Sequence, residues 1–355
     1  MSAFINRIGT ATPQHDVHAA FVAFASAGLP EGRPRALFDR MADRSGINHR
    51  WSHMQPGDLA AGEIDSDGFF QTGRFPGTAA RMAQYETQAL ELALQAVARL
   101  GCTATEITHL IVASCTGFTA PGLDIQLSAR LGLRVDVART MIGFMGCSAA
   151  VPALRAADHT VRAERDARVL VINIELCSLH MQETTDVETA LSLLLFGDGC
   201  SAALVTAEPS GVALADFRSV ILPDSAGLIT WTIGDQGFLM HLSGQVPARI
   251  ATALRADVAA GDPLGLLRGR PAAAYLSWAV HGGGRTVLDA VEVGLALPAE
   301  ALRQSRSVLR DFGNMSSCTI MFVLQRMMEA REAGPGMAMA FGPGMVAETF
   351  RFALA

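Results

Sequence analysis

Three residues far apart in this sequence have side chains that could together perform acyl transfer: Cys147 in "GFMGCSAA", His281 in "VHGGG" and Asn314 in "DFGNMSS". A thiol becomes a nucleophile when an imidazole accepts its proton, and an amide N–H can stabilise the oxyanion that follows. Each residue also has a structural interpretation, as a packing cysteine, a loop histidine or a helix N-cap. The three together favour chemistry through a thioester.

An internal repeat would bring these residues together. Segments 109–133 and 275–297 each read as a strand, a glycine-containing loop and a helix, and Cys147 follows Cys115 by nearly the same interval as Asn314 follows His281. Equivalent loops of a duplicated α/β unit lie close in space. We therefore expect Cys147 and Asn314 at matching helix starts, with His281 at a strand end. The helix start and the imidazole should then lower the pKa of the Cys147 thiol.

Short apolar runs and helical periodicity alternate along the chain. The runs at 108–114, 167–175, 201–208 and 336–341 predict buried strands, and residues 79–101 predict an amphipathic helix ending at Gly101. This alternation indicates an α/β protein. We divide it into an N-terminal half, 1–210, which carries the cysteine, and a C-terminal half, 211–355, which carries the histidine and the asparagine.

Composition excludes several classes of function. The 355 residues are 50% hydrophobic with a formal net charge of −6 and no long basic run, so nucleic acid is not an expected partner. We find no signal-peptide pattern and no apolar run of membrane-spanning length. The six cysteines are widely spaced and lack a C-x-x-C pair, which argues against a metal site or a disulfide scaffold. We expect a reduced, cytoplasmic protein.

The chain resembles a known family in five motifs that occur in the family's order: "GFMGCSAA", "LFGDGCSAA", "VHGGGRTVLDAVE", "DFGNMSS" and "AFGPG". They are similar to those of type III polyketide synthases, the chalcone-synthase-like enzymes of the thiolase superfamily, and look closest to the bacterial type. The resemblance implies the thiolase-like five-layered αβαβα fold, with two pseudo-repeated halves that each hold a mixed sheet. It also implies a homodimer.

The activity that the resemblance implies is iterative decarboxylative condensation. An acyl-CoA starter would be held as a thioester on Cys147, and malonyl-CoA would be decarboxylated beside His281 and Asn314. Cyclisation would release a pyrone, resorcinol or phloroglucinol-type product. Acyl-CoA and malonyl-CoA are then substrates, and no separate cofactor is expected. The alternatives are a ketoacyl synthase III-like enzyme that condenses once, and a non-catalytic dimer partner that binds acyl-CoA.

The resemblance also assigns residues to the cavity. Phe196 matches an aromatic gatekeeper, and Met240 occupies a second gatekeeper position that is usually phenylalanine. Trp231 stands where plant enzymes have glycine, so its indole should fill or redirect the cavity. These two replacements argue against a plant-type aromatic starter, and the resemblance to bacterial members favours an aliphatic acyl-CoA, including a long one held in a side tunnel. Further matches to the cavity wall are Ser316, Phe341, Gly342 and Pro343.

Three residues occupy wall positions that plant enzymes fill with threonine: Cys115, Cys177 and His180. We expect Cys115 to be an apolar wall residue, because nothing nearby in the sequence would ionise it, with a second reactive thiol as the alternative. His180 could assist cyclisation or could satisfy a buried hydrogen bond, and the sequence does not separate these interpretations.

The expected coenzyme A site lies on a short helix between Pro34 and Gly46. Arg40 and Arg44 are four residues apart, so they should share one helical face and could hold phosphates. They match two of the family's three basic contacts, and Leu37 replaces the third. Gly283 would let the backbone approach the ligand. Two other family positions differ, with Ala120 where a methionine crosses the dimer interface and Gly282 in place of proline.

Overall fold

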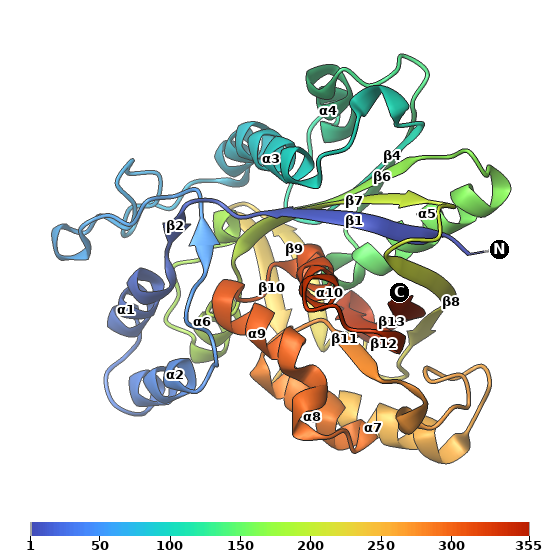
Figure 1. The fold of residues 1–355 in the computed structure, drawn as a ribbon. Helices are drawn as coiled ribbons and strands as arrows, with labels where there is room; N and C mark the ends of the chain where they lie inside the picture. The colour runs from blue at the N-terminus through green and yellow to red at the C-terminus, as the bar shows by residue number, and fades with distance from the viewer. Residues whose placement is uncertain (1, 355) are drawn as a thin grey trace.

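A computed structural model describes residues 2–354 of the chain, within which nine strands form one continuous sheet (Figure 1). The strands lie in the order β11-β12-β13-β8-β1-β7-β6-β4-β5. Their bounds are β1 Phe4–Ala11, β4 His109–Ser114, β5 Ala138–Gly143, β6 Val169–Leu176, β7 Asp198–Thr206, β8 Val212–Ile221, β11 Ser277–Val280, β12 Gly334–Gly342 and β13 Val346–Leu354. Two two-stranded antiparallel sheets lie outside this sheet: β2 His15–Asp16 with β3 Trp51–Ser52, and β9 Ile229–Gly234 with β10 Gly237–Leu242.

The strand pairing confirms the predicted internal repeat. In the first half β7 is antiparallel to β1 and β6, and β6 is parallel to β4. In the second half β13 is antiparallel to β8 and β12, and β12 is parallel to β11. We expected two separate sheets, but Phe4 and Ile5 of β1 pair with Ala213 and Val212 of β8. This short antiparallel contact joins the two sheets at their edges.

The helices cover both outer faces and fill the middle of the molecule. Their bounds are α1 His18–Gly28, α2 Arg33–Asp43, α3 Thr78–Leu100, α4 Leu123–Leu131, α5 Ala150–Ala163, α6 Val187–Leu193, α7 Val246–Ala260, α8 Arg285–Leu295, α9 Arg303–Phe312 and α10 Thr319–Glu329. Figure 1 shows α3 and α4 on one side of the molecule and α7 and α8 on the other, with α10 between them. No helix within residues 2–354 is long and apolar enough to cross a membrane.

Alternation along the buried strands produces the five layers. On β6, Val169 and Val171 face the central helices, whereas Leu170 and Ile172 face α3 and α4. On β12, alanines point to the central helices and methionines point toward α7 and α8. Side chains with a period of two serve both faces of a buried sheet. The layers are therefore helix, sheet, helix, sheet, helix, as the family resemblance implied.

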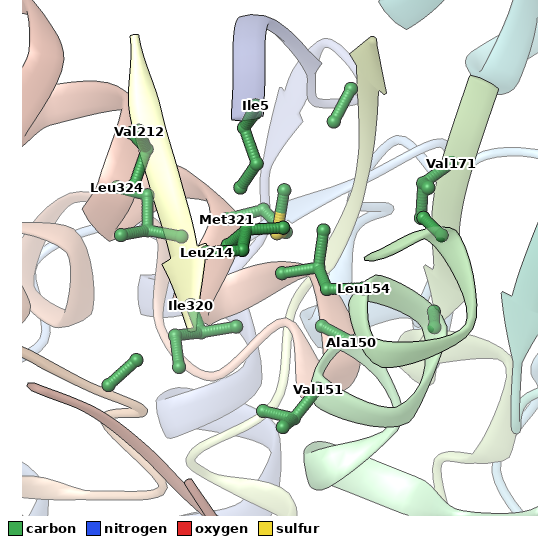
Figure 2. Packing of buried hydrophobic residues seen from close by; sticks show 14 of the residues in the cluster. Ile5, Ala150, Val151, Leu154, Val171, Val212, Leu214, Ile320, Met321 and Leu324 are labelled. Atoms are coloured by element: carbon green, nitrogen blue, oxygen red, sulfur yellow. The ribbon is translucent and has the colours of Figure 1, made fainter. Parts of the chain in front are cut away.

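The central layer consists of α5 and α10, which begin just after the segments carrying Cys147 and Asn314. Figure 2 shows Ala150, Val151 and Leu154 of α5 in one cluster with Ile320 and Met321 of α10. All five are fully buried. Such close packing fixes the starts of both helices relative to each other. The fold thus places the two predicted loops side by side.

Candidate active site

Cys147 lies in the 3-10 turn Gly146–Ser148 that leads into α5. The end of β12 packs directly behind this turn. A Cβ on Gly146 would lie 2.5 Å from Cδ of Pro343, and a Cβ on Gly342 would lie 2.4 Å from Oγ of Ser148. Both distances are too short for any side chain. The Gly342–Pro343 segment therefore fixes the position of the turn that carries the thiol.

Asn314 reaches the same point from the second half of the chain, between α9 and the turn Ser316–Cys318. Its Oδ1 accepts a hydrogen bond from the Ser316 N–H at 2.8 Å, and its Nδ2 donates to the carbonyl of Gly283 at 3.3 Å. The amide lies beside the nucleophile, with Cys147 Sγ 4.0 Å from Nδ2. The amide thus directs one Nδ2 hydrogen to Gly283 and the other to the thiol.

His281 directly follows β11, where its backbone N–H donates to Met339 at 2.8 Å. Its side chain is only 1% exposed, and neither ring nitrogen has a hydrogen-bond partner within the described residues. Nε2 faces the glycine loop, since a Cβ on Gly283 would lie 3.6 Å from it. Buried polar atoms almost always have partners, so two orphaned nitrogens on one ring indicate a group kept for a ligand.

One sequence expectation about protonation is wrong for this unliganded site. Burial raises the pKa of the Cys147 thiol to about 11, although hydrogen bonds with Ser316 and Asn314 oppose the shift. Burial also lowers the pKa of His281 to about 3. Desolvation of the charged forms outweighs the helix start and the imidazole. The resting pair is therefore a neutral thiol and a neutral imidazole.

A buried carboxylate lies behind the cavity wall. Glu175 is 0% exposed, and it accepts hydrogen bonds from Ser317 Oγ at 2.6 Å, Thr116 Oγ1 at 2.9 Å and Cys115 N at 3.0 Å. The thiol of Cys115 lies 3.4 Å from Glu175 Oε2 and 3.4 Å from Ser316 Oγ. Burial and this carboxylate raise the pKa of Cys115 well above its ordinary range. A protonated thiol agrees with a wall residue.

The cavity at Cys147 is small, because large side chains line it. Its volume is about 20 Å³, and its lining includes Phe196, Trp231, Met240 and Pro343. Trp231 and Met240 are direct cross-strand neighbours on β9 and β10. The indole is fixed by a hydrogen bond from Nε1 to the Cys115 carbonyl at 2.7 Å. This space holds about one water molecule.

The other wall residues differ in how closely they approach the nucleophile. Cys177 and Ser316 line the cavity, whereas Phe341 packs in the core formed with α7 and α8. The imidazole of His180 is fully engaged by the backbone, because Nε2 lies 2.7 Å from the Thr116 carbonyl and Nδ1 accepts the Phe238 N–H at 2.9 Å. These bonds favour the structural interpretation of His180.

A second opening, the Arg44 pocket, lies between the end of α2, α6 and the start of α8. Its volume is about 400 Å³, and Leu37, Arg44, Leu195 and Gly283 are among its lining residues. We expected Arg40 and Arg44 to act together, and Arg44, which directly follows the last residue of α2, does line this pocket. Arg40 is exposed on α2 and does not line this pocket.

Two residues of the site were not identified from the sequence. Glu175 is the one charged residue of the buried strand β6, in which Asn173 is the other polar residue, and this was a usable signal. Arg50 gave no such signal, because it lies in a polar segment. It is buried, and its Nη1 donates to the carbonyls of Phe196 at 2.8 Å and Leu193 at 3.1 Å. Arg50 therefore holds the backbone at the gatekeeper.

Comparison with known proteins identifies relatives along the whole chain. The family models described as chalcone and stilbene synthases match residues 2–209 with the N-terminal domain and residues 214–353 with the C-terminal domain. The structure of PKS-I from the brown alga Ectocarpus siliculosus is 30% identical with a TM-score of 0.87, over 100% of this chain and 98% of that one.

Two more distant structures share the fold. The C-terminal type III polyketide synthase domain of Steely1, a type I/III hybrid from Dictyostelium, is 22% identical with a TM-score of 0.89, over 100% of this chain and 99% of that one. A mutant of CsyB is also 22% identical, with a TM-score of 0.86 and 100% of both chains covered.

Proposed function

The chain belongs to the chalcone and stilbene synthase family and is a type III polyketide synthase, and we propose that Cys147, His281 and Asn314 carry out its acyl transfer. The observation that supports this most strongly is the buried, unpartnered imidazole of His281, which lies against Gly283. The Asn314 amide donates to the carbonyl of the same glycine, and its Nδ2 lies 4.0 Å from Cys147 Sγ. Structural residues would have satisfied their own hydrogen bonds.

Loading of the starter uses the neutral resting pair. His281 accepts the thiol proton as Cys147 Sγ attacks the carbonyl of the acyl-CoA thioester. The Nδ2–H of Asn314 that faces the thiol in the resting site then stabilises the tetrahedral oxyanion. The bond between the carbonyl carbon and the coenzyme sulfur then breaks, and coenzyme A leaves with the proton from His281. The acyl group remains on Cys147 as a thioester.

Extension uses the same two residues on malonyl-CoA. The bond to the terminal carboxylate breaks and CO₂ leaves, while the electron pair moves onto the thioester oxygen as an enolate. His281 and Asn314 donate hydrogen bonds to that oxygen in a site from which most water is excluded. The enolate carbon attacks the acyl-Cys147 carbonyl, and the bond to Sγ breaks. Return of the longer chain to Cys147 allows another cycle.

We propose an aliphatic acyl-CoA as the starter, and release of the product by cyclisation to a pyrone, resorcinol or phloroglucinol-type ring. Trp231 and Met240 support this choice, because they occupy the space beside the nucleophile. In this proposal the pantetheine arm of each substrate enters through the Arg44 pocket, which ends at Gly283 beside the catalytic amide.

A homodimer is part of the proposal. Within residues 2–354, strand β5 forms one edge of the sheet and pairs only with β4. Large apolar side chains are exposed on and near this edge, at Phe118, Met141 and Met145. An uncovered sheet edge with apolar neighbours requires protection. Light scattering coupled to size-exclusion chromatography should give twice the 37.5 kDa chain mass, and a monomer would overturn this part.

We also place the protein in a reducing, cytoplasmic compartment. All six cysteines are free thiols, and four of them are buried. Localisation of a fluorescent fusion in the native host would test this placement. Secretion of the fusion would overturn it.

The function itself is tested by counting malonyl units. Purified protein is incubated with hexanoyl-CoA and carbon-13-labelled malonyl-CoA, and the products are read by mass spectrometry. Two or more labelled units per starter support iterative extension. A single unit would instead indicate a ketoacyl synthase-like enzyme, and no product with any starter would favour a non-catalytic acyl-CoA-binding protein.

A further inference from the structure

The hairpin formed by β9 and β10 carries two side chains of the cavity wall but lies outside the main sheet. Among the described residues, its strands pair only with each other. Trp231 and Met240 are opposite each other in this pair, and both line the cavity at Cys147 and an apolar chamber of about 70 Å³ next to it. They therefore form part of the wall between the two spaces. A two-stranded sheet alone is marginally stable, so contacts from elsewhere have to hold this wall in place.

The tip of the hairpin is held by Thr78, the first residue of α3. Its backbone N–H donates to the Asp235 carbonyl at 2.8 Å. Its Oγ1 accepts the N–H of Gly237 at 2.8 Å and donates to the carbonyl of Gly234. Gly234 and Gly237 are the residue pair next to the turn. One hydroxyl group thus uses both its donor and its acceptor capacity to bridge the two strands where they meet.

Arg81, one turn further along α3, lies against the same tip. Its side chain is fully buried, and a Cβ on Gly237 would lie 2.8 Å from its Nη1. Nη1 donates to the carbonyls of Leu179 at 2.6 Å and Met181 at 2.8 Å. The first turn of α3 therefore fixes both the hairpin tip and the residues on either side of His180.

His180 joins the middle of the hairpin to the cavity wall. Its Nδ1 accepts the N–H of Phe238 at 2.9 Å, and the two rings stack with their centres 4.1 Å apart. Burial lowers the pKa of His180 to about 3, so the imidazole is neutral and Nδ1 stays an acceptor. The Trp231 ring meets both of these rings edge-on, at 5.3 and 5.7 Å between centres. A displacement at Gly237 is therefore passed through Phe238 to the indole.

We propose that Thr78 is a positioning residue that limits the number of malonyl units by holding the hairpin tip, an inference that rests on the proposed function. The cavity at Cys147 measures about 20 Å³, so a growing chain gains room only where Trp231 or Met240 moves aside. A fixed tip prevents this movement. One hydrogen bond shifts an equilibrium by about fivefold, so loss of both hydroxyl bonds should make a displaced tip about 25-fold more frequent.

The test is Thr78→Val, which removes the hydroxyl and keeps the size of the side chain. With hexanoyl-CoA and labelled malonyl-CoA, the share of products that contain more malonyl units than the main wild-type product should rise at least threefold. The kcat and KM for malonyl-CoA should stay within twofold, because Thr78 contacts neither the nucleophile nor its partners. Hydrogen–deuterium exchange of the peptide 229–242 should become at least tenfold faster. Thr78→Ser keeps the hydroxyl and should restore both the product lengths and the exchange rate.

Thr108→Val is the matched control. The Thr108 hydroxyl is also partly buried, accepts the Arg168 N–H at 2.9 Å and lies 2.8 Å from Nδ1 of His109. Thr108 precedes β4, at the end of the strand away from Cys115, and lines neither the cavity nor the chamber. This variant should keep the wild-type product lengths. Thr78→Ala takes the place of Thr78→Val if valine prevents folding, because alanine is better tolerated in a helix.

Unchanged product lengths in Thr78→Val would overturn the inference and leave the synthase function standing, even if the peptide 229–242 exchanged faster. Equally longer products from Thr108→Val would also overturn it, because a general loss of stability would then be the cause. Longer products from Thr78→Ser would show that the hydroxyl is not responsible. Absence of polyketide from the wild-type protein with every starter would overturn both the inference and the proposed function.

Discussion

Replacement of Trp231 by alanine should lengthen the polyketide. The indole lies between the cavity of about 20 Å³ at Cys147 and the chamber of about 70 Å³ beside it. Its removal joins the two spaces. The indole has nine heavy atoms beyond Cβ and each ketide unit adds three, so the protein gains room for about two or three further units at constant packing density.

The same change should destabilise the protein. Truncation of a buried tryptophan to alanine costs about 3–5 kcal/mol, and partial exposure of Trp231 places it near the lower end. The hydrogen bond from Nε1 to the Cys115 carbonyl is lost as well. Trp231→Phe separates the two effects, because it removes the hydrogen bond but keeps six of the nine ring atoms. It should cost about 1 kcal/mol for the lost hydrogen bond and lengthen the product by one unit at most.

Mass spectrometry of products made from hexanoyl-CoA and labelled malonyl-CoA gives the number of extensions directly. Trp231→Ala should incorporate about two or three more malonyl units than the wild type, and Trp231→Phe one more at most. An unchanged malonyl count in Trp231→Ala would refute the idea that the indole limits the cavity. An equal increase in Trp231→Phe would show that the hydrogen bond, not the volume, sets product length.

Three further predictions follow from the same site. His281 titrates near pH 3 in the folded protein and near its ordinary value of 6.5 when unfolded, so the unfolded state binds the extra proton and stability falls as pH drops below 6.5. His281→Gln should therefore reduce the slope of the free energy of unfolding against pH by about 1.4 kcal/mol per pH unit. Urea denaturation of both proteins between pH 6 and 4.5 measures this slope. Equal slopes for the variant and the wild type would contradict the low pKa of His281. Gly342→Ala should displace the turn that carries Cys147, because the new Cβ would lie 2.4 Å from Ser148 Oγ. We expect kcat to fall at least tenfold while KM for malonyl-CoA changes little. A variant with the wild-type kcat would show that the turn can move without loss of activity. Glu175→Gln should lower the free energy of unfolding by about 1–3 kcal/mol, because an amide cannot accept all the hydrogen bonds that the carboxylate receives. A variant as stable as the wild type would mean that one of these donors does not bond to Glu175 in the folded protein.

The repeat was the most informative feature of the sequence, because it predicted where two loops meet. Cys115 and Cys147 both lie in the segment between the parallel strands β4 and β6. His281 and Asn314 both lie in the equivalent segment, between the parallel strands β11 and β12. Strand and helix positions also followed from local patterns, as at Gly101, which ends α3 in the left-handed conformation. Such signals come from residues that are near one another in the chain, so a single sequence is enough to detect them.

Properties set by several segments at once were not predictable. The pKa of the Cys147 thiol depends on how completely the two halves bury it, and that burial outweighed the helix start used in our expectation. Arg44 lines the pocket and Arg40 does not, which the spacing of the two arginines alone did not show. The chamber behind Trp231 combines α1, residues 54–70 and two strands of the second half. Its presence is a property of packing, not of any motif.

The central claim is that Cys147 holds the acyl group, and mass spectrometry of the intact protein tests it most directly. After incubation with hexanoyl-CoA alone, the account predicts one added hexanoyl group, located by peptide mapping to the segment that contains Cys147. Cys147→Ala should show neither the adduct nor polyketide formation, and Cys115→Ala should keep the adduct. An adduct on Cys115, or normal product formation by Cys147→Ala, would contradict the account.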